Sequence, residues 1–206
     1  SSKEPTEFTG YDELKTKSKI TGIKKENNTD LVILDKSPFY VESGGQVDDK
    51  GSLILGNNNL KVVDLLKVDD KIIHVIENDS TKLLQPDADL VAEVDFRFRW
   101  DVMRNHSVTH FLHASLRKVL GTHVHQSGSY VGNDHLRFDF THFTKPSPEE
   151  LREIEIMVNE QLRRNHPMTH HRNIPFDKAK EMGALMFFGD KYGDKVNVVQ
   201  FGDFTM

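Results

Sequence analysis

The sequence predicts an α+β protein, with a small barrel or sandwich of strands in its first half and mixed helices and strands in its second. Short runs rich in Val, Ile and Leu alternate with turn residues as far as about residue 94. Many short strands at such spacing are typical of a barrel or a sandwich. From about residue 97 the periodicity becomes helical, so we place a domain boundary between regions 1–96 and 97–206.

The strands of the first half are expected where β-branched and aliphatic residues cluster between Asn, Asp and Gly turns. The predicted strands are residues 20–24, 30–34, 51–55, 60–66, 72–76 and 89–94.

The first helix of the second half is predicted from about Asp101 to Leu120, with Gly121 as its stop. At about 100° per residue, one broad face is apolar and the opposite face carries histidines. The apolar face holds Val108, Phe111, Leu112, Leu116 and Val119, and the other holds His106, His110, His113 and Arg117. We therefore expect one side to pack into a core, while the histidine side is presented elsewhere.

The rest of the second half shows one strong helix signal among weaker ones. Ser147-Pro148-Glu149-Glu150 is a capping box with Pro at the first helical position, and it predicts a helix to about Arg164. The other expected elements are a hairpin of strands 127–131 and 135–140, a short helix at 176–182 and a last strand at 196–201.

Composition is that of a globular chain long enough to form a core. The chain has 206 residues, of which 36% are hydrophobic and 29% charged. It has no cysteine, which excludes disulfides and thiolate nucleophiles and fits a reducing, cytoplasmic setting. No stretch is apolar for long enough to predict a membrane helix. The N-terminus has neither an initiator Met nor a signal region, so we expect a piece of a longer protein.

Charge limits the kind of nucleic-acid contact that is expected. A net charge of −5 argues against a free-standing nucleic-acid binder, but it allows a domain that receives RNA held by its neighbours. Two basic clusters stand out, each interpreted as a solvated face or a phosphate contact. They are Arg97, Arg99 and Arg104, and then Arg163, Arg164, His166, His170, His171 and Arg172.

The strongest local signal for chemistry is the pair His106 and His110. Histidines four residues apart share one face of a helix, so both imidazoles can bind one metal ion, with Zn²⁺ the natural candidate. Ser107 stands where a His-Glu-X-X-His peptidase has its general base, so peptidase chemistry is not expected. A chance pair of surface histidines is the simpler alternative. His113 is either a third ligand or, with Arg117, ordinary helix surface.

Two loops offer further polar groups. In Ser43-Gly44-Gly45-Gln46 the glycines allow a turn with positive φ or a close approach to a ligand, and Gln46 offers donors and acceptors. The simpler interpretation is a hairpin turn with a surface Gln. Lys191, in a Gly- and Asp-rich loop, is either part of a turn or a contact to phosphate or ribose.

Together these segments resemble the editing region of alanyl-tRNA synthetases. The resemblance runs in order along residues 20–206, and it is carried by segments 38–46, 104–114, 121–126, 136–140, 183–194 and 202–204. It implies that region 1–96 is the β-barrel that precedes the editing domain, and that region 97–206 is the α+β editing domain. Threonyl-tRNA synthetases share the second domain but lack this barrel.

The resemblance also implies a reaction, the hydrolysis of Ser-tRNA(Ala) and Gly-tRNA(Ala). A pocket that accepts alanine cannot exclude glycine or strongly reject serine, so a second sieve must remove the errors. Zn²⁺ would be held by His106 and His110 and by a later Cys-X-X-X-His, which this sequence does not contain. Gln46 would position the ester or a water, and Thr109 would recognise the serine hydroxyl. The expected contacts to substrate and tRNA are Gly44, Gly45, Gln126, Arg137 and Lys191.

The expected partners are mischarged tRNA(Ala) and other domains of the same synthetase. ATP and Mg²⁺ would be used only by an aminoacylation domain upstream. Three alternatives stay open: a free-standing trans-editing deacylase, a catalytically silent tRNA-binding module, and a metal-dependent hydrolase of a small molecule.

Overall fold

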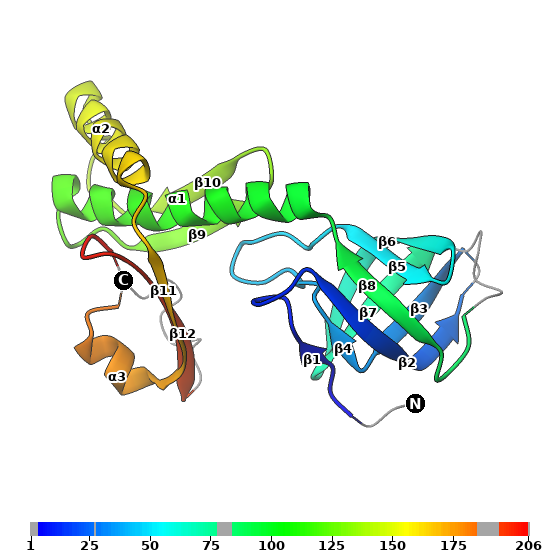
Figure 1. The fold of residues 1–206 in the computed structure, drawn as a ribbon. Helices are drawn as coiled ribbons and strands as arrows, with labels where there is room; N and C mark the ends of the chain where they lie inside the picture. Colours follow the sequence, from blue (N-terminus) through cyan, green and yellow to red (C-terminus); the bar gives the residue numbers. More distant parts are fainter. Residues whose placement is uncertain (1–3, 27, 78–83, 185–193, 206) are drawn as a thin grey trace. The chain divides into compact units, whose positions relative to one another are not determined.

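The computed structural model describes residues 4–26, 28–77, 84–184 and 194–205. The chain forms two compact units (Figure 1). One holds Ser1–Met103 and Gly132–Asp134, and the other holds Arg104–Val131 and His135–Met206. The long helix α1 (Phe96–Leu120) runs through the division, and the boundary predicted near residue 97 falls in its first turn.

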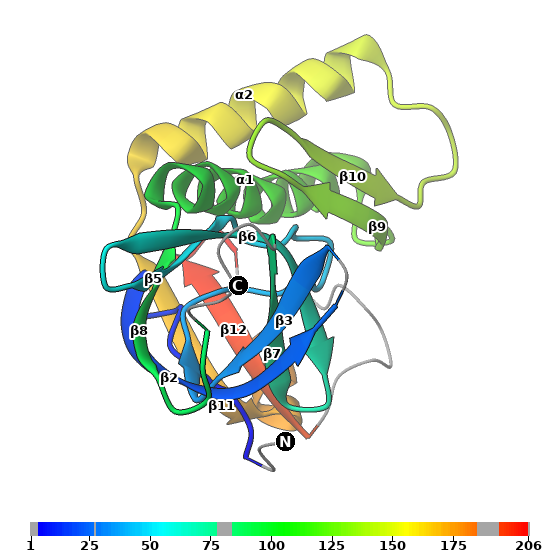
Figure 2. The same ribbon diagram turned by 90° about the vertical axis from the view of Figure 1, so that its right-hand side faces the viewer.

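The first unit contains a closed six-stranded barrel in the order β2-β3-β7-β6-β5-β8. All six neighbouring pairs are antiparallel. The strands are β2 (Lys15–Lys25), β3 (Thr29–Leu34), β5 (Gly51–Leu55), β6 (Asn58–Val68), β7 (Lys71–Glu77) and β8 (Asp89–Val94). Every predicted strand is present, and closure decides for the barrel against the sandwich. Figure 2 shows the strands after the view is turned by 90° about the vertical axis.

Alternation along the strands fills the barrel. In β3 the side chains of Asp30, Val32 and Leu34 are buried, while the residues between them are partly exposed. Period-2 burial of this kind is the pattern of a strand with one face on a core. The core also includes Phe39, which is fully buried. Asp30 is the exception in chemistry, because it is 0% exposed and neither carboxylate oxygen has a hydrogen-bond partner within the described part of the chain.

Two short strands of the first unit are additions to the sequence prediction. β1 (Glu7–Phe8) and β4 (Lys36–Ser37) pair in parallel. Each has two residues, which is too short for an alternating pattern to be visible in the sequence.

The prediction that α1 begins near Asp101 was wrong, because the helix begins at Phe96. The Asp95 side chain accepts a hydrogen bond from the Phe98 backbone N–H at 3.0 Å, and the Asp95 carbonyl accepts from Arg99 N–H. Asp95 therefore acts as the N-cap, and its carboxylate satisfies a backbone donor of the first turn. The end at Leu120 agrees with the prediction.

The predicted hairpin and the capped helix are both confirmed in the second unit. The hairpin consists of β9 (Gln126–Val131) and β10 (Leu136–Phe140). Helix α2 (Pro148–Arg164) has Ser147 as its N-cap, and both hydrogen bonds of the capping box with Glu150 are present. No helix in the described ranges is long and apolar enough to cross a membrane.

The last elements of the second unit are β11 (Met168–Pro175), α3 (Phe176–Glu181) and β12 (Lys195–Phe201). The short helix and the final strand were predicted, but β11 was not. Its sequence, Met-Thr-His-His-Arg-Asn-Ile-Pro, has no apolar alternation, and it becomes a strand by pairing antiparallel with β12. The core of this unit draws on α1, α2, β10 and β12, with Phe111, Leu116, Ile154, Val158 and Phe201 at its centre.

Candidate functional site

The turn Ser43-Gly44-Gly45-Gln46 has the backbone that its glycines predict. Gly44 has φ 61° and Gly45 has φ 86°, a conformation that residues with a Cβ rarely adopt. Ser43 and Gln46 exchange backbone hydrogen bonds of 3.2 and 3.1 Å across the turn. Gln46 is only 7% exposed, so the interpretation of a surface Gln was wrong. The turn presents a glutamine whose side chain is held away from bulk water.

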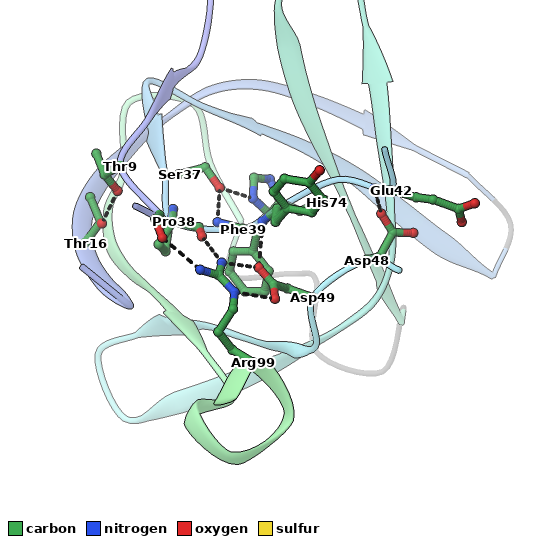
Figure 3. A network of polar contacts seen from close by, with 12 residues as sticks. Thr9, Thr16, Ser37, Pro38, Phe39, Glu42, Asp48, Asp49, His74 and Arg99 are labelled. Carbon is green, nitrogen blue, oxygen red and sulfur yellow. Dashed lines mark hydrogen bonds and ion pairs between the residues drawn. The ribbon is translucent and has the colours of Figure 1, made fainter. Parts of the chain in front are cut away.

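A buried ion pair holds the segment that carries this turn (Figure 3). Asp49 accepts a hydrogen bond of 2.6 Å from Tyr40 N–H, and Asp49 N–H donates to the Tyr40 carbonyl at 3.1 Å. Arg99 donates two hydrogen bonds to the same carboxylate, from Nε to Oδ1 at 2.7 Å and from Nη2 to Oδ2. Its remaining donors reach the carbonyls of Gly10 at 2.8 Å and Pro38 at 2.9 Å. One guanidinium therefore joins α1, the N-terminal segment and both ends of the turn segment.

This arrangement corrects the interpretation of Arg99 as part of a solvated or phosphate-contacting cluster. The side chain of Arg99 is 7% exposed and that of Asp49 is 1% exposed. Buried and bonded to Asp49 and to two backbone carbonyls, the guanidinium serves structure and not an external anion.

A second buried contact chain runs beside it through His74 (Figure 3). His74 Nδ1 lies 3.1 Å from the Val32 carbonyl, and its Nε2 lies 2.9 Å from Ser37 Oγ. Ser37 Oγ in turn accepts from Phe39 N–H at 3.2 Å. Since a carbonyl can only accept, Nδ1 carries the proton and Nε2 accepts from the serine hydroxyl. Full burial lowers the pKa of His74 to about 4, so the ring is neutral at pH 7.

In the second unit, the predicted histidine pair lies together on α1. The imidazole rings of His106 and His110 are 5.3 Å apart between centroids and only 6° from parallel. This follows from their spacing, because side chains four residues apart stack along one helical face. Thr109 is beside them in sequence, is 5% exposed, and donates its hydroxyl to the Asn105 carbonyl at 3.0 Å.

On the histidine side of α1, His110 and His113 are buried, while His106 and Arg117 are partly exposed. His110 is 9% exposed and packs near Phe201, with ring centroids 5.9 Å apart. His113 is 2% exposed and packs near Phe138 at 5.3 Å, so its interpretation as helix surface was wrong. Phe201 of β12 and Phe138 of β10 therefore cover His110 and His113, and Phe201 also packs on Phe111 of the apolar face.

Burial keeps these imidazoles neutral. It lowers the pKa of His106, and burial together with repulsion from His106 and His113 lowers the pKa of His110 to about 3. Burial and the charge of Arg117 lower the pKa of His113 to about 4. A neutral imidazole is the form that binds a transition metal. The donor chemistry of His106 and His110 therefore fits zinc, although across the four described ranges no three His, Asp or Glu side chains gather to hold a metal.

The polar candidates that follow α1 are separated by the pleat of the hairpin. Gln126 begins β9; its Nε2 donates to Ser129 Oγ at 2.9 Å, while its Oε1 is buried without a hydrogen-bond partner in the described chain. Arg137 in β10 is 66% exposed and pairs with Asp139 at 3.1 Å. Because neighbouring strand residues point to opposite faces, Arg137 lies on the face away from Phe138 and His113. Lys191 lies outside the described residues.

Sequence reasoning found the histidine pair and the glycine turn but missed what holds the turn. Asp49 and Arg99 are 50 residues apart, and neither belongs to a local motif. His74 lies within an apolar strand, so its position inside a Val- and Ile-rich run is the one signal that it is buried.

Comparison with known proteins identifies relatives along nearly the whole chain. Residues 1–97 match the family model described as tRNA synthetases class II (A). Alanine–tRNA ligases match at 42% identity in Chlorobium chlorochromatii, covering 95% of this chain and 23% of that protein. The match is 47% in Bacteroides fragilis, covering 96% of this chain and 23% of the relative. In Parabacteroides distasonis the identity is 44%, and the match covers 95% of this chain and 22% of that protein. The chain thus spans under a quarter of the length of these relatives, and its predicted similarity to alanyl-tRNA synthetases is confirmed.

Proposed function

Because this chain belongs to the alanyl-tRNA synthetase family, we propose that it is the family's editing module and hydrolyses tRNA(Ala) mischarged with serine or glycine. The parent enzyme, in this proposal, attaches alanine to tRNA(Ala) with ATP and Mg²⁺ in a separate domain and works in the cytoplasm. The barrel is residues 1–96 and the editing domain residues 97–206, the latter of the kind shared with threonyl-tRNA synthetases.

The observation that carries the proposal is the pair of parallel, neutral imidazoles on α1. Neutral rings 5.3 Å apart offer nitrogen lone pairs to one metal ion without first losing protons. When bound there with further ligands, zinc supplies Lewis-acid chemistry to an ester carbonyl, an amino group or a water. His106 and His110 are the residues of this chain that would hold it.

Thr109 and Gln126 are suited to recognising the amino acid. The Thr109 hydroxyl already donates to the Asn105 carbonyl, so its remaining lone pairs can accept a hydrogen bond from the serine hydroxyl. Gln126 Oε1 is a buried acceptor that has no donor among the described residues. A substrate hydroxyl or ammonium group could donate a hydrogen bond to it. The ammonium group is common to serine and alanine, so only the serine hydroxyl, accepted by Thr109 or donated to Gln126, distinguishes Ser-tRNA from Ala-tRNA.

The glycine turn and the remaining polar residues complete the proposal. Gln46, held in a tight turn by Gly44 and Gly45, positions the ester or a water with its amide. Arg137, exposed on its strand, and Lys191 contact the tRNA backbone.

The test is the rate at which the purified chain deacylates Ser-tRNA(Ala), with Ala-tRNA(Ala) as the control substrate. We expect Ser-tRNA to be cleaved faster, and Gln46→Ala and Thr109→Val to slow its cleavage by about 10- to 100-fold, because each removes one positioned hydrogen-bonding group. Equal rates on the two substrates would contradict editing. Binding of tRNA without cleavage, even with zinc and with an extended chain, would favour the silent binding module.

Zinc binding is tested apart from activity. Titration with zinc against a chromophoric chelator should show a site that His106→Ala weakens by at least tenfold. The exposed histidine His135, at the hairpin turn, provides the control, and His135→Ala should leave the affinity unchanged. Equal zinc affinity in the His106 variant and the wild type would remove His106 from the ligands.

A further inference from the structure

A layered aromatic cluster at the end of α1 carries a function that the proposed editing chemistry does not use. It consists of His123, which follows the helix, and of His142 and Phe143, which follow β10. Phe143 is 85% exposed, more than any other large hydrophobic residue among those described. A single exposed apolar ring is common on protein surfaces, so the case for a ligand depends on how this ring is held and on what lies beside it.

His123 supports the other two rings of the cluster. Gly121 has φ 113°, and a Cβ on it would lie 2.9 Å from His123 Nδ1, so the absence of a side chain makes room for the imidazole. His123 Nε2 lies 2.8 Å from His142 Nδ1, with the two rings 18° from parallel. Phe143 stacks on His123 at 4.5 Å between centroids and 24° between planes. His123 therefore contacts both His142 and Phe143, and Gly121 leaves the room that its imidazole needs.

The backbone around the cluster is fixed as well. Arg117 Nη1 donates to the carbonyls of Thr122 at 2.6 Å and Val124 at 2.8 Å. Thr141 N–H donates to the His125 carbonyl at 2.9 Å, and this joins the segment after α1 to the segment after β10. Phe143 thus projects from a segment whose neighbouring backbone is held by these hydrogen bonds.

The charges next to the cluster favour an anionic partner. The segments 117–126 and 141–147 contain Arg117, Lys118 and Lys145 but no Asp or Glu. Arg117 donates to the two carbonyls and Lys118 lies 3.6 Å from the centre of the Phe204 ring, so Lys145, two residues after Phe143, is the cation best placed in sequence to meet a phosphate. A flat, exposed aromatic ring beside cations is the combination that binds unpaired bases of RNA, because the ring stacks on the base and the cations contact the phosphates.

We propose that Phe143, supported by His123 and His142, is a stacking platform for an unpaired base at the 3′ end of tRNA. This inference rests on the proposed function in one respect, namely that tRNA is the RNA concerned. It assigns to the cluster a binding role that is separate from the histidine pair on α1.

The test measures the affinity of the full 206-residue chain for deacylated tRNA(Ala), and for the same tRNA without its unpaired 3′ nucleotides. Phe143→Ala should weaken binding of the complete tRNA by roughly 5- to 100-fold, as loss of one base–aromatic stack does. Phe143→Trp should preserve it. With the shortened tRNA, wild type and Phe143→Ala should bind equally. Leu151→Ala, at a residue that is 49% exposed on α2, is the control for loss of an exposed apolar side chain.

A second variant tests the support of the platform. Gly121→Ala would press a Cβ against His123, so it should weaken binding of the complete tRNA and leave the shortened tRNA unaffected. A fluorescent 2-aminopurine at the 3′ terminus should be quenched by wild type and not by Phe143→Ala.

Three results would overturn the inference. Binding by Phe143→Ala within twofold of wild type would show that the ring contacts no base, and would leave a protein partner as its occupant. An equal loss with complete and shortened tRNA would place the contact away from the 3′ end. If wild type binds no tRNA at all, the proposed function fails together with this inference. If wild type deacylates Ser-tRNA(Ala) while Phe143→Ala binds normally, only the platform fails.

Discussion

At the scale of single residues, Arg99 and Asp49 are two charges with almost no access to water. Removing two ions from water costs several kcal/mol each, and the pair recovers this only through close geometry and full hydrogen bonding. Here the guanidinium meets one carboxylate and two backbone carbonyls. Through these bonds the pair fixes the segment that carries the glycine turn. Removing either partner would leave the other charge buried and unpaired.

We therefore predict that Asp49→Ala lowers the free energy of unfolding of the barrel unit by about 3–5 kcal/mol. Urea unfolding followed by fluorescence of Trp100, the one tryptophan in the sequence, measures this. Lys15→Ala, which breaks the exposed 2.8 Å pair with Glu93, is the control and should cost under about 1 kcal/mol. Equal effects of the two variants would contradict the structural role of Asp49.

His74 makes the barrel sensitive to acid. Its pKa is about 4 in the folded protein against 6.5 in the unfolded chain, so between these values only the unfolded state binds the proton. The stabilisation is complete above pH 6.5 and is lost as the pH falls towards 4. By linkage, this loss amounts to about 3 kcal/mol.

The prediction is that His74→Gln flattens this part of the pH dependence, because a Gln amide can donate to the Val32 carbonyl and accept from Ser37 without titrating. Urea unfolding at pH 7, 5.5 and 4.5 measures it, with the exposed histidine variant His135→Gln expected to keep the wild-type slope. An unchanged slope in His74→Gln would assign the acid sensitivity to other groups.

Asp30 is a residue that the fold tolerates at a cost. Its carboxylate is fully buried, and both oxygens lack hydrogen-bond partners in the described chain. An uncompensated polar group of this kind costs about 1–3 kcal/mol. We expect Asp30→Val, which suits an inward strand position, to raise the free energy of unfolding by about that amount. Asp89→Val, on the exposed side of β8, is the control and should have little effect; a less stable Asp30→Val protein would show that the carboxylate has a favourable role.

At the scale of elements, local hydrogen bonding starts α2. Ser147 Oγ accepts from Glu150 N–H at 3.2 Å, and the Glu150 carboxylate accepts from Ser147 N–H at 2.7 Å. Ser147→Ala should therefore lower the stability of the second unit by about 1 kcal/mol, while Ser147→Asp should retain most of it. Thermal unfolding followed by circular dichroism at 222 nm measures both. Equal losses in the two variants would show that the cap contributes through something other than an accepting oxygen.

Elements with a local signal were predicted from the sequence, and elements formed by distant pairing were not. Runs rich in Val, Ile and Leu between turn residues located the barrel strands, and the capping box located α2. β11 was missed because its residues carry no pattern of their own and become a strand only against β12. The start of α1 was misplaced because Asp95, its cap, was overlooked in favour of Asp101.

The same distinction applies to the candidate site. The spacing of His106 and His110 predicted that their rings would lie together, because one helix fixes both. The burial of His113 and Gln46 could not be predicted, since it depends on which strands or loops cover them. The Asp49–Arg99 pair depends on tertiary structure in the same way.

At the scale of the whole molecule, two compact units have separate cores, one in the barrel and one around α1 and α2. We predict that they unfold in two transitions. Asp49→Ala should shift the transition seen by Trp100 fluorescence, and Ser147→Ala should shift mainly a transition seen by circular dichroism. A single transition, shifted equally by both variants at both probes, would show that the units fold as one.

Closure of the barrel has a further consequence. The strand that opens it, β2, and the strand that ends it, β8, are neighbours, and Lys15 is paired with Glu93. Opposed residues of antiparallel strands lie about 5 Å apart, so the chain enters and leaves the barrel at nearly the same point. A unit with adjacent ends behaves as a cassette. Such a unit can be inserted into a host protein without separating the host's flanking segments, provided that the insert keeps Gly10 and extends through Arg99, which hold the barrel from outside its strands.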